Sequence, residues 1–118
     1  MTIKECYEII GGDYDDIMSR LIKEERIVRF LGMFLNEGCY NDLVKAIEDE
    51  NVDEAFCAAH TLKGVCNNMA FTALSKSSVD VTEALRAKDI NLAKTFMPKL
   101  IEEYDLTVKT INELLGDK

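Results

Sequence analysis

The sequence predicts an all-α fold, an antiparallel up-down four-helix bundle with additional short N-terminal helices. Apolar residues recur at the three- and four-residue spacing of amphipathic helices, and no stretch shows the alternation of a half-buried strand. One proline and no tryptophan occur in 118 residues, of which 47% are apolar. Connections between the long helical stretches are short, so consecutive helices should pack antiparallel. This length suits one domain, residues 1–118, with a single modest core.

The helices follow one another with clear start and stop signals. Gly11-Gly12 ends the first, and Asp13 and Asp53 are expected N-caps because a short polar side chain can accept hydrogen bonds from the first-turn N–H groups. Pro98 should kink or split the last helix. The expected helices span residues 2–10, 13–21, 24–36, 42–50, 53–68, 72–87 and 90–115, with Asn41 as an alternative start of the fourth.

The charge balance excludes several classes of partner. Lys and Arg number 14 against 22 Asp and Glu, giving a formal net charge of −8. Such a field repels phosphate backbones and anionic lipids, which argues against nucleic-acid and membrane-surface roles. No apolar run approaches the roughly 20 residues that span a bilayer, and the N-terminus has no signal-peptide pattern. We therefore expect a cytoplasmic protein.

Four dispersed cysteines, Cys6, Cys39, Cys57 and Cys66, form no CxxC pair. In a reducing compartment the expected state is free, buried thiols. Cys57 shares a helix face with His60, but Cys66 points to the other side of that helix. A third metal ligand is missing, so no zinc site and no cofactor are predicted.

The only histidine, His60, lies on the polar side of its helix. With 3.6 residues per turn over residues 53–71, the apolar stripe is centred opposite this histidine. A core histidine would sit on the stripe, so His60 should be exposed. Its face also carries Phe56, Cys57, Lys63, Gly64, Asn67 and Asn68.

Two of these neighbours indicate what the histidine does. Lys63, one turn on, places a positive charge where an anion bound to the ring would sit. Gly64 costs the helix about 0.5–1 kcal/mol relative to alanine, and it clears the next turn so that another molecule can reach the imidazole. A neutral imidazole is a good nucleophile near pH 7. The three residues together predict a site for a transferable phosphoryl group.

The run His60-Thr61-Leu62-Lys63-Gly64, preceded by Ala58-Ala59, resembles the AHxLKG signature of histidine-containing phosphotransfer (HPt) domains. The similarity extends from about Phe30 to Lys88. It implies that His60 accepts a phosphoryl group from an aspartyl phosphate on a receiver domain and passes it to another receiver. It also implies that the receiver supplies Mg²⁺, and that the partners are response-regulator receiver domains and hybrid sensor histidine kinases.

The chain should not phosphorylate itself. It has no Gly-rich nucleotide loop and no GxxxxGKS/T motif. Thr61 follows the histidine, where sensor-kinase helices usually carry an acidic residue. We therefore expect a phosphocarrier without autonomous kinase activity.

Supporting residues are harder to assign from the sequence. Antiparallel pairing places His60 opposite about Asp80 to Thr82, and HPt domains commonly support the ring with a polar residue from that helix. Thr82 is the candidate for this support, or else an ordinary polar surface residue. Phe56 either belongs to a docking surface or leans into a groove between helices. Cys57, Gly64 and Asn67 complete the expected docking surface.

The chain departs from the HPt pattern at two positions. Many family members carry glycine where Asn67 and Ala70 stand here. We expect altered partner preference rather than loss of function. Intact His60, Lys63 and Gly64 argue against a degenerate member that binds receivers without carrying phosphate.

Two other functions remain open. The first is a helical adaptor that docks on receiver or kinase domains without chemistry, although such a protein has no need of His60, Lys63 and Gly64 on one face. The second is an enzyme that uses His60 as a general base, for which no nucleophile or orienting carboxylate is evident. We expect a monomer, because a symmetric dimer through the histidine face would hide the site.

Overall fold

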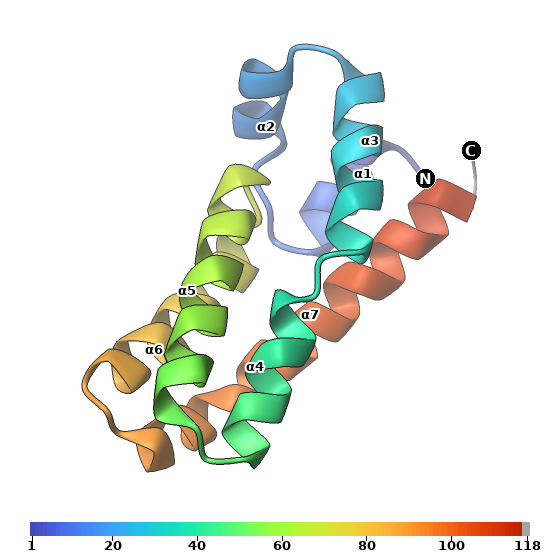
Figure 1. Cartoon of the computed structure of the whole chain (residues 1–118). Coiled ribbons are helices and arrows are strands. Elements are labelled where there is room, and N and C mark those ends of the chain that lie inside the picture. The colour runs from blue at the N-terminus through green and yellow to red at the C-terminus, as the bar shows by residue number, and fades with distance from the viewer. Residues whose placement is uncertain (117–118) are drawn as a thin grey trace.

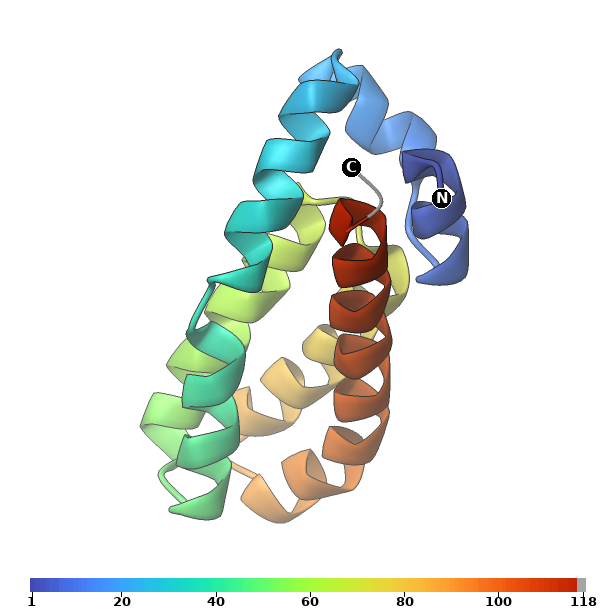
Figure 2. The same cartoon turned by 90° about the vertical axis from the view of Figure 1, so that its right-hand side faces the viewer.

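The computed structural model describes residues 1–116, which form helices and no strands, and this confirms the all-α prediction. In Figure 2, α3 and α4 follow one another along one side of the bundle, and α5, α6 and α7 form the rest. The two short helices α1 and α2 lie at one end (Figure 1). The helices are α1 (Ile3–Ile9), α2 (Tyr14–Leu21), α3 (Glu24–Leu35), α4 (Cys39–Glu48), α5 (Val52–Asn68), α6 (Thr72–Arg86) and α7 (Ile90–Gly116).

The core is packed with small side chains on α5 and with aromatic side chains on other helices. The buried side of α5 carries Ala55 and Ala59, whose short side chains let the neighbouring helices approach closely. Tyr40 of α4 stacks on Tyr104 of α7 with ring centroids 3.6 Å apart. This stacking joins α4 to α7, the last helix of the bundle.

The three turns that connect α4 to α7 share one backbone geometry. Glu50, Ala70 and Lys88 have φ of 55°, 57° and 59°, the left-handed conformation that commonly ends a helix. After each of them, the next backbone N–H donates to the carbonyl five residues earlier, at 2.9–3.0 Å. These hydrogen bonds satisfy the ends of the helices and reverse the chain, which produces the antiparallel bundle.

Two predicted boundaries need correction. Helix α4 begins at Cys39, ahead of Asn41. Helix α5 is capped by Asn51, whose Oδ1 accepts from the Glu54 backbone N–H at 3.1 Å, so Asp53 lies inside the first turn. Asparagine caps a helix as well as aspartate does. The left-handed Glu50 ends the preceding turn, so the new helix begins directly after Asn51.

Pro98 does not split the last helix, since α7 continues through it. Proline removes one N–H, which leaves the carbonyl of Lys94 without its helical donor. Both residues lie on the exposed side of α7, where water can bind this carbonyl. Of the two predicted effects, a kink or a split, the split is therefore excluded. Asp13, by contrast, caps α2 as expected by accepting from the Asp16 N–H at 3.0 Å.

The short N-terminal helices are bonded to the C-terminal end of α5. The buried Tyr7 hydroxyl donates to the Met69 carbonyl at 2.9 Å. Arg20 donates to the Asn67 carbonyl at 2.8 Å, and it is held by an ion pair with Asp16 at 2.6 Å. This end of the histidine helix is therefore fixed by contacts from outside the bundle. Within residues 1–116, no helix is both long and apolar enough to cross a membrane.

Candidate functional site

His60 lies in the middle of α5 and is exposed, as the position of the apolar stripe predicted. Its neighbour Ala59 is fully buried, so the helix turns one side to the core and the other to solvent. Among the described residues, the imidazole has no hydrogen-bond or ion-pair partner. Its ring lies 5.9 Å from the ring of Phe56, at an interplanar angle of 46°. Both ring nitrogens are therefore available to an incoming molecule.

Lys63 and Gly64 leave the space beside the histidine open. The Lys63 side chain is partly exposed and makes no ion pair within residues 1–116. A Cβ added to Gly64 would meet no atom of the described residues within 4 Å. Packing inside the protein does not require this glycine, so the unoccupied space over the helix is available to another molecule. The arrangement joins a nucleophile, a free cation and an approach path on one helix face.

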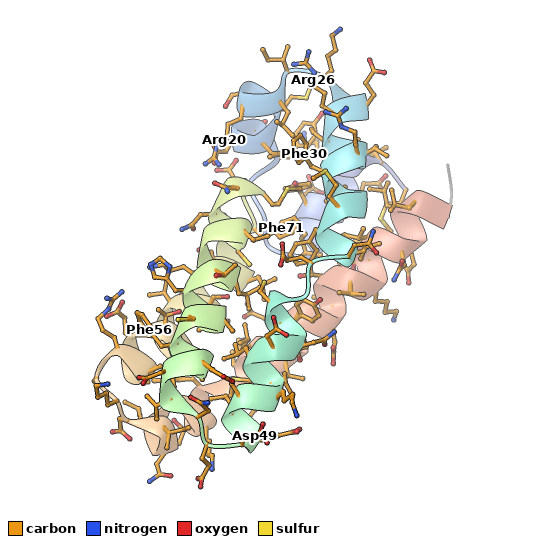
Figure 3. All side chains as sticks on the ribbon, viewed as in Figure 1. Arg20, Arg26, Phe30, Asp49, Phe56 and Phe71 are labelled. Atoms are coloured by element: carbon orange, nitrogen blue, oxygen red, sulfur yellow. The ribbon has the colours of Figure 1, made fainter. Side chains whose placement is uncertain are left out.

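Phe56 lies at the edge of the core beside His60, and its part in docking stays a prediction. It is half-buried and packs against the core, and it also touches the histidine ring. The Arg86 guanidinium lies 5.0 Å from the centre of the Phe56 ring, a cation–π contact. Figure 3 shows Phe56 on the outer side of α5, where this helix runs beside α6.

Sequence analysis missed Arg86. Its guanidinium lies over Phe56 and also meets Glu83 at 3.3 Å. The register that sets His60 opposite about residue 81 sets Phe56 opposite about residue 85, so the signal was present in the sequence. The arginine brings a second positive charge to this side of the histidine.

The prediction that Thr82 supports the imidazole is wrong. Thr82 is fully buried, and its hydroxyl donates to the Ser78 carbonyl of its own helix at 2.6 Å. The antiparallel register was nearly right, but the side chain is directed into the core rather than toward the exposed ring. Ser75, Ser77 and Ser78 are buried on the same helix, so polar residues of α6 serve its packing.

Asn67 has a structural role at the end of α5. Its Oδ1 accepts from the buried Ser75 hydroxyl at 2.5 Å, and its carbonyl accepts from Arg20. Asn67 thus links α5 to both α6 and α2, and its predicted part in docking stays a prediction. Ala70, the second departure from the family glycines, has a left-handed φ of 57°. Glycine adopts that conformation without strain, which gives a backbone reason for the family preference.

All four cysteines are free, and three of them are buried. Burial raises the pKa of Cys6 and Cys39 to about 11 and that of Cys66 to about 12. Cys57 is exposed and is the exception to the expectation of buried thiols. Over residues 1–116, no group of three or more His, Cys, Asp or Glu side chains could hold a metal ion.

Comparison with known proteins identifies the class to which this fold and site belong. Residues 29–111 match the Hpt domain family, and no curated protein or solved structure matches the chain. The match covers most of the chain, which therefore belongs to the Hpt domain family. Hpt domains are phosphotransfer modules of two-component signalling that interact with receiver domains and kinases. Helices α1 and α2 lie outside the matched residues.

Proposed function

We propose that this protein is a phosphotransfer intermediate of a phosphorelay. His60 accepts a phosphoryl group from an aspartyl phosphate on one receiver domain and passes it to another receiver. The observation that carries the proposal is the exposed His60 beside Lys63 and an open Gly64, with neither side chain paired to any residue of 1–116. The protein acts as a monomer, because the histidine face must stay accessible.

The chemistry needs little more than these residues and the partner. The Nε2 atom of neutral His60 attacks the phosphorus, while the proton on Nδ1 stays in place. The new N–P bond replaces the P–O bond to the aspartate, whose carboxylate leaves with the electron pair. The second transfer reverses these steps toward the aspartate of another receiver.

The protein contributes position and charge, which dominate phosphoryl transfer. Lys63 offsets the negative charge of the phosphoryl oxygens, and Gly64 lets the receiver approach the ring. Arg86 holds the Phe56 ring beside His60 and adds positive charge on the α6 side. The receiver supplies Mg²⁺ and the acidic pocket that binds it.

The test is transfer from a panel of phosphorylated receiver domains in the presence of Mg²⁺. We expect acid-labile, alkali-stable label on the wild-type protein and none on His60→Gln. The substitution should leave the thermal unfolding midpoint unchanged, because the ring is exposed and has no hydrogen bond to residues 1–116 to lose. Label on the His60→Gln variant would refute the assignment. Receivers that bind without transferring label would favour the adaptor.

A further inference from the structure

A surface groove of about 660 Å³ runs between α4 and α5 on the side of the histidine away from Arg86. Small side chains line its floor, among them Ala46 of α4 and Ala58 of α5. Cys57 and Thr61 also line it, one turn before His60 and one residue after it. The groove is therefore continuous with the surface that a receiver must cover. Figure 1 shows its two helices side by side.

The rim of this groove is acidic, and its charge is largely uncompensated. Four carboxylates line it, those of Glu37, Asp42, Asp53 and Glu54. The carboxylates of Asp42 and Glu54 make no hydrogen bond or ion pair among the described residues. Lys45 is the one cation among the described residues of the lining, and its ammonium group lies 3.6 Å from Asp49, which lies outside the lining.

The other side of α5 has the opposite character. Arg86 and Lys88 of the α6 side line a second groove together with Phe56, and Asp53 borders both grooves, so the described lining of the second has two cations against one carboxylate. Lys88 lies 3.4 Å from Asp53, but both side chains are more than three-quarters exposed (76% and 87%), so this pair is weak and both charges stay accessible to a partner. Arg86 is likewise in an exposed pair, with Glu83 at 3.3 Å. His60 thus stands between an acidic groove toward α4 and a basic groove toward α6.

We propose that the groove between α4 and α5 binds a basic amphipathic helix of the receiver partner. The apolar side of that helix lies on Ala46 and Ala58, and its lysine or arginine side chains face Asp42 and Glu54. A groove between two helices that has small residues at its base can accommodate a third helix. This inference rests on the proposed phosphotransfer function and adds the chemistry of the surface that the partner must present.

The division of charge also sets the orientation of the complex. Complementary potentials steer encounter and fix the register of two surfaces. The acidic phosphorylation pocket of a receiver is drawn toward Lys63 and Arg86, and a basic helix beside it is drawn toward α4. A receiver docked the other way round would meet like charge on both sides.

The test measures binding separately from chemistry. The probes are those receiver domains that label His60 in the transfer assay. They are used here in the unphosphorylated form. Their Kd is measured by titration calorimetry at low and high salt. The groove variant is Asp42→Asn with Glu54→Gln. The matched control is Glu102→Gln with Glu113→Gln, which removes the same charge from exposed positions on α7.

We expect the groove variant to raise Kd about tenfold at low salt and to make binding less sensitive to salt, since rim charges act mainly on steering and salt dependence. The control should stay within about twofold of wild type. In NMR titrations the methyl signals of Ala46 and Ala58 should shift on binding. Unchanged affinity and salt dependence in the groove variant would overturn the groove inference. Label on His60 in the same protein would still support phosphotransfer. Failure of every receiver to label His60 would overturn the proposed function, and this inference with it.

Discussion

The middle of α5 and its C-terminal end are built in opposite ways. In the middle, the side chains of His60 and Lys63 make no hydrogen bond or ion pair within the described chain, and Gly64 leaves the space beside them open. At the end, Tyr7 and Arg20 bond to carbonyls of the last turn from two other helices. The reactive part of α5 is left exposed. The orientation of the helix is fixed by its buried side and by the hydrogen bonds at its C-terminal end.

This difference separates stability from function along a single helix. Gly64 weakens the helix by about 0.5–1 kcal/mol relative to alanine. A buried hydrogen bond such as that of Tyr7 contributes about 0.5–1.5 kcal/mol and offsets a loss of that size. Substitutions in the middle should therefore change transfer, and substitutions at the end should change stability.

The largest effect is expected from Gly64→Gln, which places a side chain over the approach to His60. Transfer from receivers should fall roughly 100-fold, because displacement of the reacting groups by even about 1 Å is that costly. The free energy of unfolding should rise slightly, since the added Cβ meets nothing within 4 Å and glutamine favours helix. Single-turnover transfer and denaturant unfolding measure the two quantities.

Gly32 supplies a matched control for this substitution. It also lies inside a helix, α3, where an added Cβ would have no atom of residues 1–116 within 4 Å. Gly32→Gln should raise stability by a similar amount and leave transfer unchanged. Normal transfer by Gly64→Gln would remove the argument that the open turn serves access.

A smaller effect is expected from Lys63→Ala. Loss of this cation should slow transfer about tenfold, or about 1.4 kcal/mol in the barrier, and the difference should shrink as salt is added. Lys109→Ala removes the same charge from an exposed position on α7 and should transfer at the wild-type rate. Equal rates for the two variants would show that Lys63 has no part in the reaction.

The smallest effect on transfer is expected from Tyr7→Phe, which leaves the site untouched. The variant loses the hydrogen bond to the Met69 carbonyl, so the free energy of unfolding should fall by about 1 kcal/mol. Transfer should stay at the wild-type rate while the protein is folded. Tyr14→Phe is the control, because that tyrosine has a ring contact with Tyr7 but no hydroxyl hydrogen bond within residues 1–116. A loss of transfer without a loss of stability would mean that the two regions of α5 are coupled.

The sequence by itself determined the helices and the exposed side of α5. Helical periodicity and capping residues act over a few neighbouring positions, so the ends of α3 and α7 could be placed to within one residue of those observed. The position of His60 opposite the apolar stripe depends only on 3.6 residues per turn. The family resemblance rested on this same local run, and the match over residues 29–111 confirms it.

The tertiary structure alone decided what each helix presents to its neighbour. Successive residues of a helix are turned about 100° from one another, so a register that is nearly right can still leave a side chain facing the core. Thr82 is buried for this reason, and Arg86, one turn on, reaches Phe56. The acidic groove likewise combines residues of α4 and α5, and its charge pattern exists only once these helices lie side by side.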